Sequence, residues 1–359
     1  MKKIKSICIL FVIGAFFCFL PSIGQTTTVN CPTDSLQAAI DGASSGDTIL
    51  VAGTCTENVS VNSHHSYITL DGNNTATIHS PDPTLFSVKI LGQSVTIKNF
   101  TITGGSVGVG VVWGGSAIIN HNTISDNQYG VEVYANSYAR ITNNTINSNT
   151  NGGVLVLSNS SATIGINGNT DTTLQPNTIQ NNGTGIILVE DSSAVIVGNT
   201  ISYNTTAGIS VSEHSSARIG ISSGSDTTTK SNNIQHNSNT TDNRGGILVT
   251  QTSSAVIVGN TVSNNTGPGI KVDKGSQADI SDNYIGGNSA NGIGVAHNSN
   301  VNLGNKTGAT IFDLPNNTVK NNVMRGVSCT LGGYVDGRLG TLNGTLGTTQ
   351  FTNGCLNAL

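Results

Sequence analysis

Four titratable residues stand out in this sequence by their type and spacing. Glu190 and Asp191 are followed 23 residues later by Glu213 and His214, in a chain in which charged residues are only 9% of the total. If successive repeats stack as parallel strands, the Glu190 and Glu213 carboxyl groups lie about 5 Å apart. That is near the separation found in retaining glycosidases, and burial or mutual repulsion would make one carboxyl an acid. The four residues are therefore candidates for catalysis.

Two other interpretations of this cluster stay open. Glu190, Asp191 and Glu213 offer the carboxylate oxygens that Ca²⁺ prefers, so they also form a candidate calcium site. No other cofactor is expected. In the third interpretation, the charges lie on a solvated turn on which nothing packs.

Aromatic and basic residues occupy the same turn position in other repeats. Trp113, the one tryptophan of the chain, precedes the repeats that hold Tyr134 and Tyr138, and Lys274 and His297 follow in later repeats. Aromatic rings beside polar groups make natural sugar platforms, because they combine an apolar body with a wet edge. The five residues are candidates for substrate binding, and a local hydrophobic cover is the alternative role for Trp113.

The elements that must hold these residues come from an internal repeat of about 23 residues. Segments 116–137, 193–215, 254–276 and 277–299 share the pattern S-A-x-I-x-x-N-T-I-x-x-N, then a turn and G-[IV]-x-[VL]-x-x-x-S. Each unit has three short apolar stretches with alternating polarity, which predicts three strands per turn of a solenoid. The chain has no helical periodicity, which excludes βαβ crossovers, and a propeller blade needs about 40 residues.

One asparagine column in the repeat predicts an internal ladder of stacked amides. Stacked amides donate to one neighbouring coil and accept from the other, and Asn tolerates left-handed turns. The column contains Asn127, Asn149, Asn182, Asn204, Asn237, Asn265, Asn288 and Asn322. A second column, from Asn122 to Asn317, opens the N-T-I motif. We expect both columns to be structural.

The first 24 residues read as an export signal. Lys2, Lys3 and Lys5 precede an apolar run over residues 7–20, which is short for a membrane span, although an uncleaved anchor is the alternative. Removal of residues 1–24 leaves 12 basic and 19 acidic residues, a net charge of 12 − 19 = −7. We expect a secreted, cell-surface or periplasmic monomer with no membrane span.

With 15 basic against 19 acidic residues and no basic run beyond the first five residues, nucleic acid is excluded as a partner.

Four cysteines remain after removal of the signal. They lie in two pairs at opposite ends of the chain, which predicts disulfides Cys31–Cys55 and Cys329–Cys355 in an oxidising compartment. Free thiols in a reducing compartment are the alternative.

The repeats resemble those of the right-handed parallel β-helix proteins of the pectin-lyase-like superfamily. The resemblance covers roughly residues 30–335, and it implies that a short helix at 34–40 plugs the open end of the solenoid. We expect an all-β chain with a signal (1–24), an N-terminal cap (25–47), a β-helix of about eleven coils (48–333) and a C-terminal cap (334–359).

The resemblance leaves the activity open. The polygalacturonase, pectate lyase and alginate epimerase motifs are mostly missing. Insertions at 166–176, 221–231 and 305–316 fall at one corner of the coil, where they would form a groove wall, and neutral loop growth after duplication is the alternative. One hypothesis is a protein that binds extracellular polysaccharide or a cell-surface glycan, or modifies it as a lyase, hydrolase or epimerase. The rival is a non-catalytic surface, adhesion or matrix rod.

Overall fold

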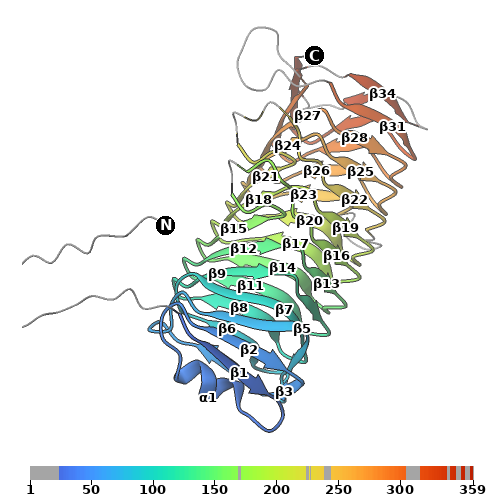
Figure 1. Cartoon of the computed structure of the whole chain (residues 1–359). Coiled ribbons are helices and arrows are strands. Elements are labelled where there is room, and N and C mark those ends of the chain that lie inside the picture. The colour runs from blue at the N-terminus through green and yellow to red at the C-terminus, as the bar shows by residue number, and fades with distance from the viewer. Residues whose placement is uncertain are drawn as a thin grey trace, which may run out of the picture.

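The chain forms a rod of stacked coils (Figure 1). The computed structural model describes residues 24–168, 171–223, 226, 228–237, 244–304, 316–337, 340–344, 349–351 and 356–358. Residues 1–23 of the expected signal, and Cys355, lie outside the described residues. Parallel strands of successive coils pair in three ladders along the rod, so the predicted parallel β-helix is confirmed.

Ladder 1 contains the S-A-x-I strands. Its members are β1 (Thr26–Asn30), β2 (Thr48–Ala52), β5 (Thr69–His79), β7 (Val95–Thr103), β9 (Ser116–Asn120), β12 (Tyr138–Thr142), β15 (Ser161–Ile164), β18 (Ser193–Ile196), β21 (Ser216–Ile219), β24 (Ser254–Val258), β27 (Gln277–Ser281), β30 (Asn300–Leu303), β33 (Tyr334–Gly337) and β36 (Leu356–Ala358).

Ladder 2 contains the T-I strands, and the long strands β5 and β7 join it to ladder 1. Its further members are β3 (Thr54–Thr56), β10 (Thr123–Ser125), β13 (Thr145–Asn147), β16 (Thr178–Gln180), β19 (Thr200–Ser202), β22 (Asn233–Gln235), β25 (Thr261–Ser263), β28 (Tyr284–Gly286), β31 (Thr318–Asn322) and β34 (Thr341–Gly344).

Ladder 3 is a separate sheet of 12 strands, one more than the eleven coils expected. Its members are β4 (Val59–Val61), β6 (Phe86–Ile90), β8 (Val107–Val112), β11 (Tyr129–Tyr134), β14 (Gly152–Leu157), β17 (Thr184–Leu188), β20 (Ala207–Val211), β23 (Ile247–Val249), β26 (Ile270–Val272), β29 (Ile293–Val295), β32 (Val327–Cys329) and β35 (Thr349–Phe351).

The core is a set of apolar columns that run along the inside of the rod. The register pairs like with like, as in Ala139 with Ala162 and Ile141 with Ile164, and the isoleucines of these columns are almost wholly buried. Because side chains alternate between the two faces of a strand, the intervening Ser and variable residues of ladder 1 point outward. The outer surface of each ladder is therefore where the repeats can differ without disturbing the core.

Each coil turns through left-handed residues. Asn143, Ser148 and the pair Ser158–Asn159 mark the three turns of one coil, with φ between 53° and 60°. The column that contains Trp113, Glu190, Glu213, Lys274 and His297 is the third of these turns, between ladder 3 and ladder 1.

The amide ladder predicted from the asparagine columns is present. Asn204 Nδ2 donates to Asn237 Oδ1 at 2.9 Å and to the Ile179 carbonyl at 3.2 Å, and Asn204 Oδ1 accepts from Asn182 Nδ2 at 3.1 Å. The second column is bonded in the same way, for example between Asn199 and Asn232. These buried amides are satisfied inside the rod, which supports a structural role for both columns.

A serine ladder accompanies the asparagine ladders. From Ser137 to Ser299, the backbone N–H of the serine before each ladder 1 strand donates to the hydroxyl of the corresponding serine in the next coil, as from Ser192 to Ser215 at 3.1 Å. These serines are buried. The conserved spacing of Ser in the repeat therefore has a structural cause.

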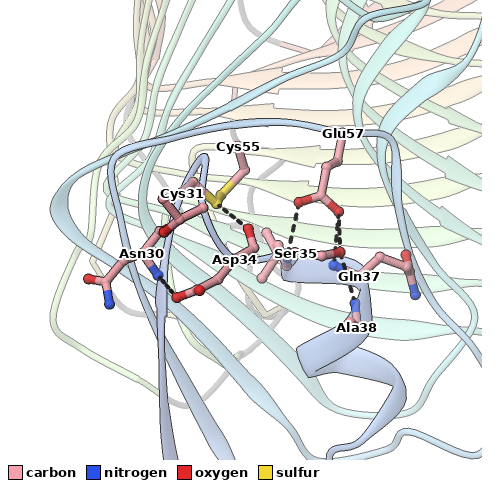
Figure 2. The surroundings of a disulfide bond; sticks show 10 residues. Asn30, Cys31, Asp34, Ser35, Gln37, Ala38, Cys55 and Glu57 are labelled. Atoms are coloured by element: carbon pink, nitrogen blue, oxygen red, sulfur yellow. Dashed lines mark hydrogen bonds between the residues drawn. A yellow bond between two sulfur atoms is a disulfide. The ribbon is translucent and has the colours of Figure 1, made fainter.

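Helix α1 (Leu36–Asp41) lies at the N-terminal end of the rod (Figure 1), and its Leu36 and Ile40 are buried. The contacts at the start of the helix and the nearby disulfide are drawn in Figure 2. The Ser35 hydroxyl caps the helix by accepting from Ala38 N–H. Glu57 reaches the same helix start, where its carboxylate accepts from Leu36 N–H at 2.8 Å and Gln37 N–H at 3.1 Å. No helix in the described part of the chain is long and apolar enough to cross a membrane.

The disulfide Cys31–Cys55 ties this cap to the first coils, as predicted. Cys329 is also disulfide-bonded, and its expected partner, Cys355, falls in the part of the chain that is not described. Strand pairing continues beyond residue 333, where the sequence predicts a cap, because β33 and β36 extend ladder 1.

We predict that Glu57→Ala destabilises the cap. The substitution leaves two helix N–H groups and the Ser35 hydroxyl without their carboxylate, so the free energy of unfolding should fall by about 1–2 kcal/mol. Glu57→Gln keeps a hydrogen-bond acceptor, so its free energy of unfolding should lie between those of the wild type and Glu57→Ala. Urea unfolding followed by circular dichroism measures the difference, and an unchanged curve for Glu57→Ala would show that Glu57 does not hold the helix.

Candidate functional site

A hollow lies on the outer face of ladder 1. It is an open groove of about 740 Å³ that crosses six consecutive strands, from β12 to β27. Half of its lining is made of Ser and Ala residues of the repeat, and the outward x positions add charged side chains, Thr163 and two valines, so the groove is open and mixed in polarity. Regular small side chains leave a channel along which a linear molecule can lie against one coil after another.

Two arginines stand on this floor. Arg140 and Arg218 occupy the outward x position of S-A-x-I, and the register Arg140–Thr163–Val195–Arg218 places them three coils, about 14 Å, apart. Neither guanidinium forms an ion pair within the described part of the chain. Such unpaired guanidinium groups are suited to bidentate recognition of carboxylates.

Tyr138 forms one end of the groove. Its hydroxyl lies 3.1 Å from Thr163 Oγ1 and accepts from Arg140 Nε at 3.4 Å. These contacts orient both Tyr138 and Arg140 over the floor. Tyr138 is therefore a predicted binding residue that the structure places in the groove.

The predicted insertions border the groove. The first insertion begins just after strand β15 and the second just after strand β21. Gly168 of the first insertion lines the groove. Each is closed at its base by the same backbone bond, from Gln175 N–H to Gly165 and from Lys230 N–H to Gly220. The third insertion, 305–316, lies outside the described residues except for Asn316.

An ion pair stiffens the second insertion. Lys230 Nζ lies 3.1 Å from Asp226 Oδ2, and Ser222 N–H donates to the same oxygen at 2.7 Å. Burial opposes ionisation of Asp226, but these hydrogen bonds hold the pKa of that carboxyl below its ordinary value. The Asp226 carboxylate is thus committed to the loop.

The groove continues toward the C-terminal end as a smaller hollow of about 250 Å³. Asp279 lines both hollows, and it stands in register with Asn302 and Asp336 on the next two coils. The face is therefore basic near β12 and β21 and acidic beyond β27.

The predicted catalytic residues lie on the turn that leads into this face. Glu190 and Asp191 precede Ser193 of the floor, and Glu213 and His214 precede Ser216. All four have left-handed backbones, and the Ser158 hydroxyl donates to Glu190 Oε2. They border the groove but are not among the residues that line it.

The predicted calcium ligands are not gathered around one point. In the described chain, one group of three His, Cys, Asp or Glu side chains has ligand atoms within 4.8 Å of one another, and it is Cys31, Cys55 and Glu57. Glu190, Asp191 and Glu213 form no such group.

Trp113 and Tyr134 lie together on the ladder 3 side of the turn. Their rings meet edge to face at 6.5 Å, and Lys89 Nζ lies 4.2 Å from the centre of the Trp113 ring. The pair is separate from the groove lining, which contains Tyr138. The aromatic candidates are thus divided between two faces of the rod.

His297 and Lys274 belong to a charged group on ladder 3. His297 Nδ1 is bonded to the buried Asp273, which also lies 3.4 Å from Lys271 Nζ and accepts from Lys274 N–H at 3.0 Å. Burial opposes ionisation of Asp273, but the His297 hydrogen bond and the Lys271 charge hold the pKa of that carboxyl below its ordinary value. These residues too lie away from the groove.

Arg140 and Arg218, which the structure places in the groove lining, are not among the residues selected from the sequence. They are present as R-I dipeptides at one repeat position, whose outward direction and shared face follow from the S-A-x-I alternation. Comparison of the x positions, rather than the turn positions, would have found them.

Two family sequence profiles match the chain. The profile described as periplasmic copper-binding protein (NosD) matches residues 40–220, and the one described as right handed beta helix region matches residues 163–338. No curated protein sequence matches.

Several solved structures share the fold. The periplasmic alginate epimerase AlgG is similar with a TM-score of 0.51 and 16% identity, over 92% of this chain and 81% of that one. The A-module of the Azotobacter vinelandii mannuronan C-5 epimerase AlgE4 is similar with a TM-score of 0.60 and 13% identity, over 90% of this chain and 94% of that one. The AlgE6 A-module has a TM-score of 0.55 and 16% identity, with the same coverage. At such identities these likenesses show the fold.

Proposed function

Because the chain belongs to the family of the periplasmic copper-binding protein NosD and is a right-handed parallel β-helix of the pectin-lyase-like superfamily, we propose that it is an exported protein that binds acidic polysaccharide in the ladder 1 groove. The observation that carries the proposal is the pair of unpaired guanidinium groups, Arg140 and Arg218, on a groove floor of small side chains. The export signal at residues 1–24 supports the location.

The chemistry of the groove favours a uronate polymer over a neutral one. The expected mature chain carries a net charge of 12 − 19 = −7, so nonspecific attraction of polyanions is not expected, and the two arginines would act locally. A linear polymer can present carboxylates at intervals along the coils, and each guanidinium can bind one with two parallel hydrogen bonds. The Ser side chains between them would meet sugar hydroxyls.

Similar structures add an independent reason. The two epimerases AlgE4 and AlgG act, by their names, on mannuronan and alginate, and they share the fold over nine-tenths of this chain. Their shared scaffold is consistent with a polysaccharide along the rod, whereas the residues that recognise it must be argued from this chain.

Binding, rather than hydrolysis by a carboxyl pair, is the activity that the groove supports best. Among the described residues that line the 740 Å³ part of the groove, Asp279 is the single carboxylate, whereas glycosidases use two. Glu190 and Glu213 on the bordering turn are proposed as secondary contacts or as catalytic groups for a polymer that overhangs this edge. The second candidate is a non-catalytic surface, adhesion or matrix rod. The absence of a carboxyl pair from the described groove lining favours this second candidate over a glycosidase.

Copper does not fit the described residues. Copper sites are built from imidazole, thiolate and thioether ligands. The one close group, Cys31, Cys55 and Glu57, has its two sulfurs joined in a disulfide and its carboxylate bonded to the start of α1. We therefore assign no step to copper, and we propose calcium only as an ion that a bound uronate could bring with it.

A polysaccharide panel tests the proposal. The mature chain is mixed with alginate, polygalacturonate and dextran, and binding is measured by calorimetry at low and high salt. We expect binding of the two acidic polymers, weakened by salt because the contacts are partly exposed charges, and none of dextran. Equal binding of dextran, or no binding of any acidic polymer, would contradict it, and assays for reducing ends and unsaturated products in the same samples test catalysis.

A further inference from the structure

A second face of the rod is apolar where the repeats elsewhere are polar. On the outer side of ladder 3, near the N-terminal end, the surface is built by the exposed Trp113 together with half-buried or buried apolar side chains, namely Phe86, Tyr129, Tyr134, Leu155 and Ile187. We call these six residues the apolar face. Trp113 is 57% exposed, at a left-handed turn position that holds Ala135 and Ser158 in the next two coils. Exposed apolar patches of this kind mark interaction surfaces.

Glycines let the rings lie flat on this face. A Cβ at Gly110 would lie 2.5 Å from the Phe86 ring, and one at Gly152 would lie 3.2 Å from the Tyr129 ring. Phe86 and Tyr129 therefore cover backbone instead of pointing into solvent. The result is a smooth surface suited to a flat partner.

The apolar face contains two residues of opposite charge, Lys89 and Glu132, and neither forms an ion pair in the described part of the chain. Lys89, Gly110 and Glu132 stand in register on β6, β8 and β11, so the two charged residues are two coils apart with a glycine between them. Lys89 lies over the Trp113 and Phe86 rings and has no carboxylate partner within the described residues.

Glu132 is the more costly of the two charges. No hydrogen bond to its carboxyl is found in the part of the chain that the structure describes, and burial raises its pKa. A carboxylate that is desolvated without a partner destabilises the surface that holds it. A partner that supplies a cation at this point would relieve that cost.

We propose that the apolar face binds a second copy of this chain in an antiparallel dimer, in which Lys89 of each copy meets Glu132 of the other. A twofold axis that lies in the interface, crosses the rod and passes over Gly110 exchanges the Lys89 and Glu132 positions, because they are equally spaced from it. Such an interface is isologous, as in most homodimers. The rings supply the buried apolar area, and the two charge pairs set the register.

The second copy is favoured over a sugar polymer by the charges. A uronate chain would meet Lys89 but would be repelled by Glu132, and a neutral sugar would leave both charges buried and unpaired. A monomer is the expectation from the sequence, and the proposed dimer departs from it. The apolar face forms because aromatic residues from different repeat positions meet there.

A charge exchange tests the dimer. Mass in solution is measured by sedimentation over a range of concentrations for the mature chain, Lys89→Glu, Glu132→Lys and the double variant. We expect a concentration-dependent dimer, at least tenfold weaker in each single variant because like charges then face each other, and restored within about threefold in the double variant. Lys274→Glu, on the same side of the rod but outside the apolar face, is the control and should leave the dimer unchanged.

The single tryptophan gives a second measurement. Trp113 is the one tryptophan of the chain, so its emission should shift to the blue at the concentrations at which the dimer forms. Addition of alginate should leave this emission unchanged, because the groove lies on another ladder, so failure of the dimer and failure of the groove are separable. If a charge-reversed variant melts early, Lys89→Gln and Glu132→Gln replace it with the same expected direction. A chain that is monomeric at every concentration, a double variant that stays weak, or tryptophan emission that responds to alginate would overturn the proposal.

Discussion

Replacement of Arg140 and Arg218 by alanine abolishes most of the binding of acidic polysaccharide in our account. A hydrogen bond to a charged group contributes about 1.5–3 kcal/mol, and the partly exposed groove calls for the lower end of this range. Loss of about 1.5 kcal/mol at each arginine amounts to about 3 kcal/mol, or roughly a hundredfold in Kd. Calorimetric titration with polygalacturonate measures the change.

Two matched variants make this result interpretable. Arg140→Lys with Arg218→Lys keeps both charges but not the bidentate geometry, so its Kd should fall between those of the wild type and the alanine variant. Lys274→Ala removes one exposed cation on the turn between ladder 3 and ladder 1, outside the groove lining, and should leave Kd within about twofold of the wild type. Equal losses for Lys274→Ala and the arginine pair would mean that binding depends on overall charge and not on the groove.

Asn204→Ala should lower the free energy of unfolding by about 1–3 kcal/mol, because Asn204 lies in the middle of a buried ladder. The substitution removes the acceptor for Asn182 and the donor to Asn237, and it leaves the Ile179 carbonyl without its amide. Thermal or urea unfolding measures the loss.

Asn147→Ala is the control for the ladder. Asn147 belongs to ladder 2 in the coil before that of Asn182, but its side chain points outward and is half-buried. The same truncation there should change stability by less than about 0.5 kcal/mol. If both variants unfold with the wild-type curve, the amide ladder does not contribute to stability.

The fold could be predicted from the sequence because each coil of a solenoid repeats the same pattern of residues. Columns such as Ile141 and Ile164, and Asn182 and Asn204, occupy the same position in coil after coil, so register and inward direction follow from alignment alone. The disulfide Cys31–Cys55 could be predicted because these two cysteines lie close together in the sequence and far from the other pair. The sequence did not show where regular strand pairing ends, because β33 and β36 lack the repeat consensus but still pair with neighbouring strands.

The site was less accessible to sequence reasoning. Departures from the neutral pattern were sought at the turn position, which has the most titratable residues, and Glu190 and Glu213 stand out there. The structure shows that this position is a left-handed turn beside a groove, and that the groove floor belongs to the x position, with Arg140 and Arg218. Two exceptions separated by three coils look unrelated in the sequence, and only the parallel register brings them onto one face.

We propose that acidic polysaccharide binds in the ladder 1 groove. A crystal structure of the mature chain with a uronate oligomer that spans at least four coils tests it most directly. We predict sugar carboxylates within hydrogen-bonding distance of both Arg140 and Arg218, with the sugar chain along the Ser floor between them. An oligomer bound on Trp113 or His297, with no sugar in the groove, would contradict the account.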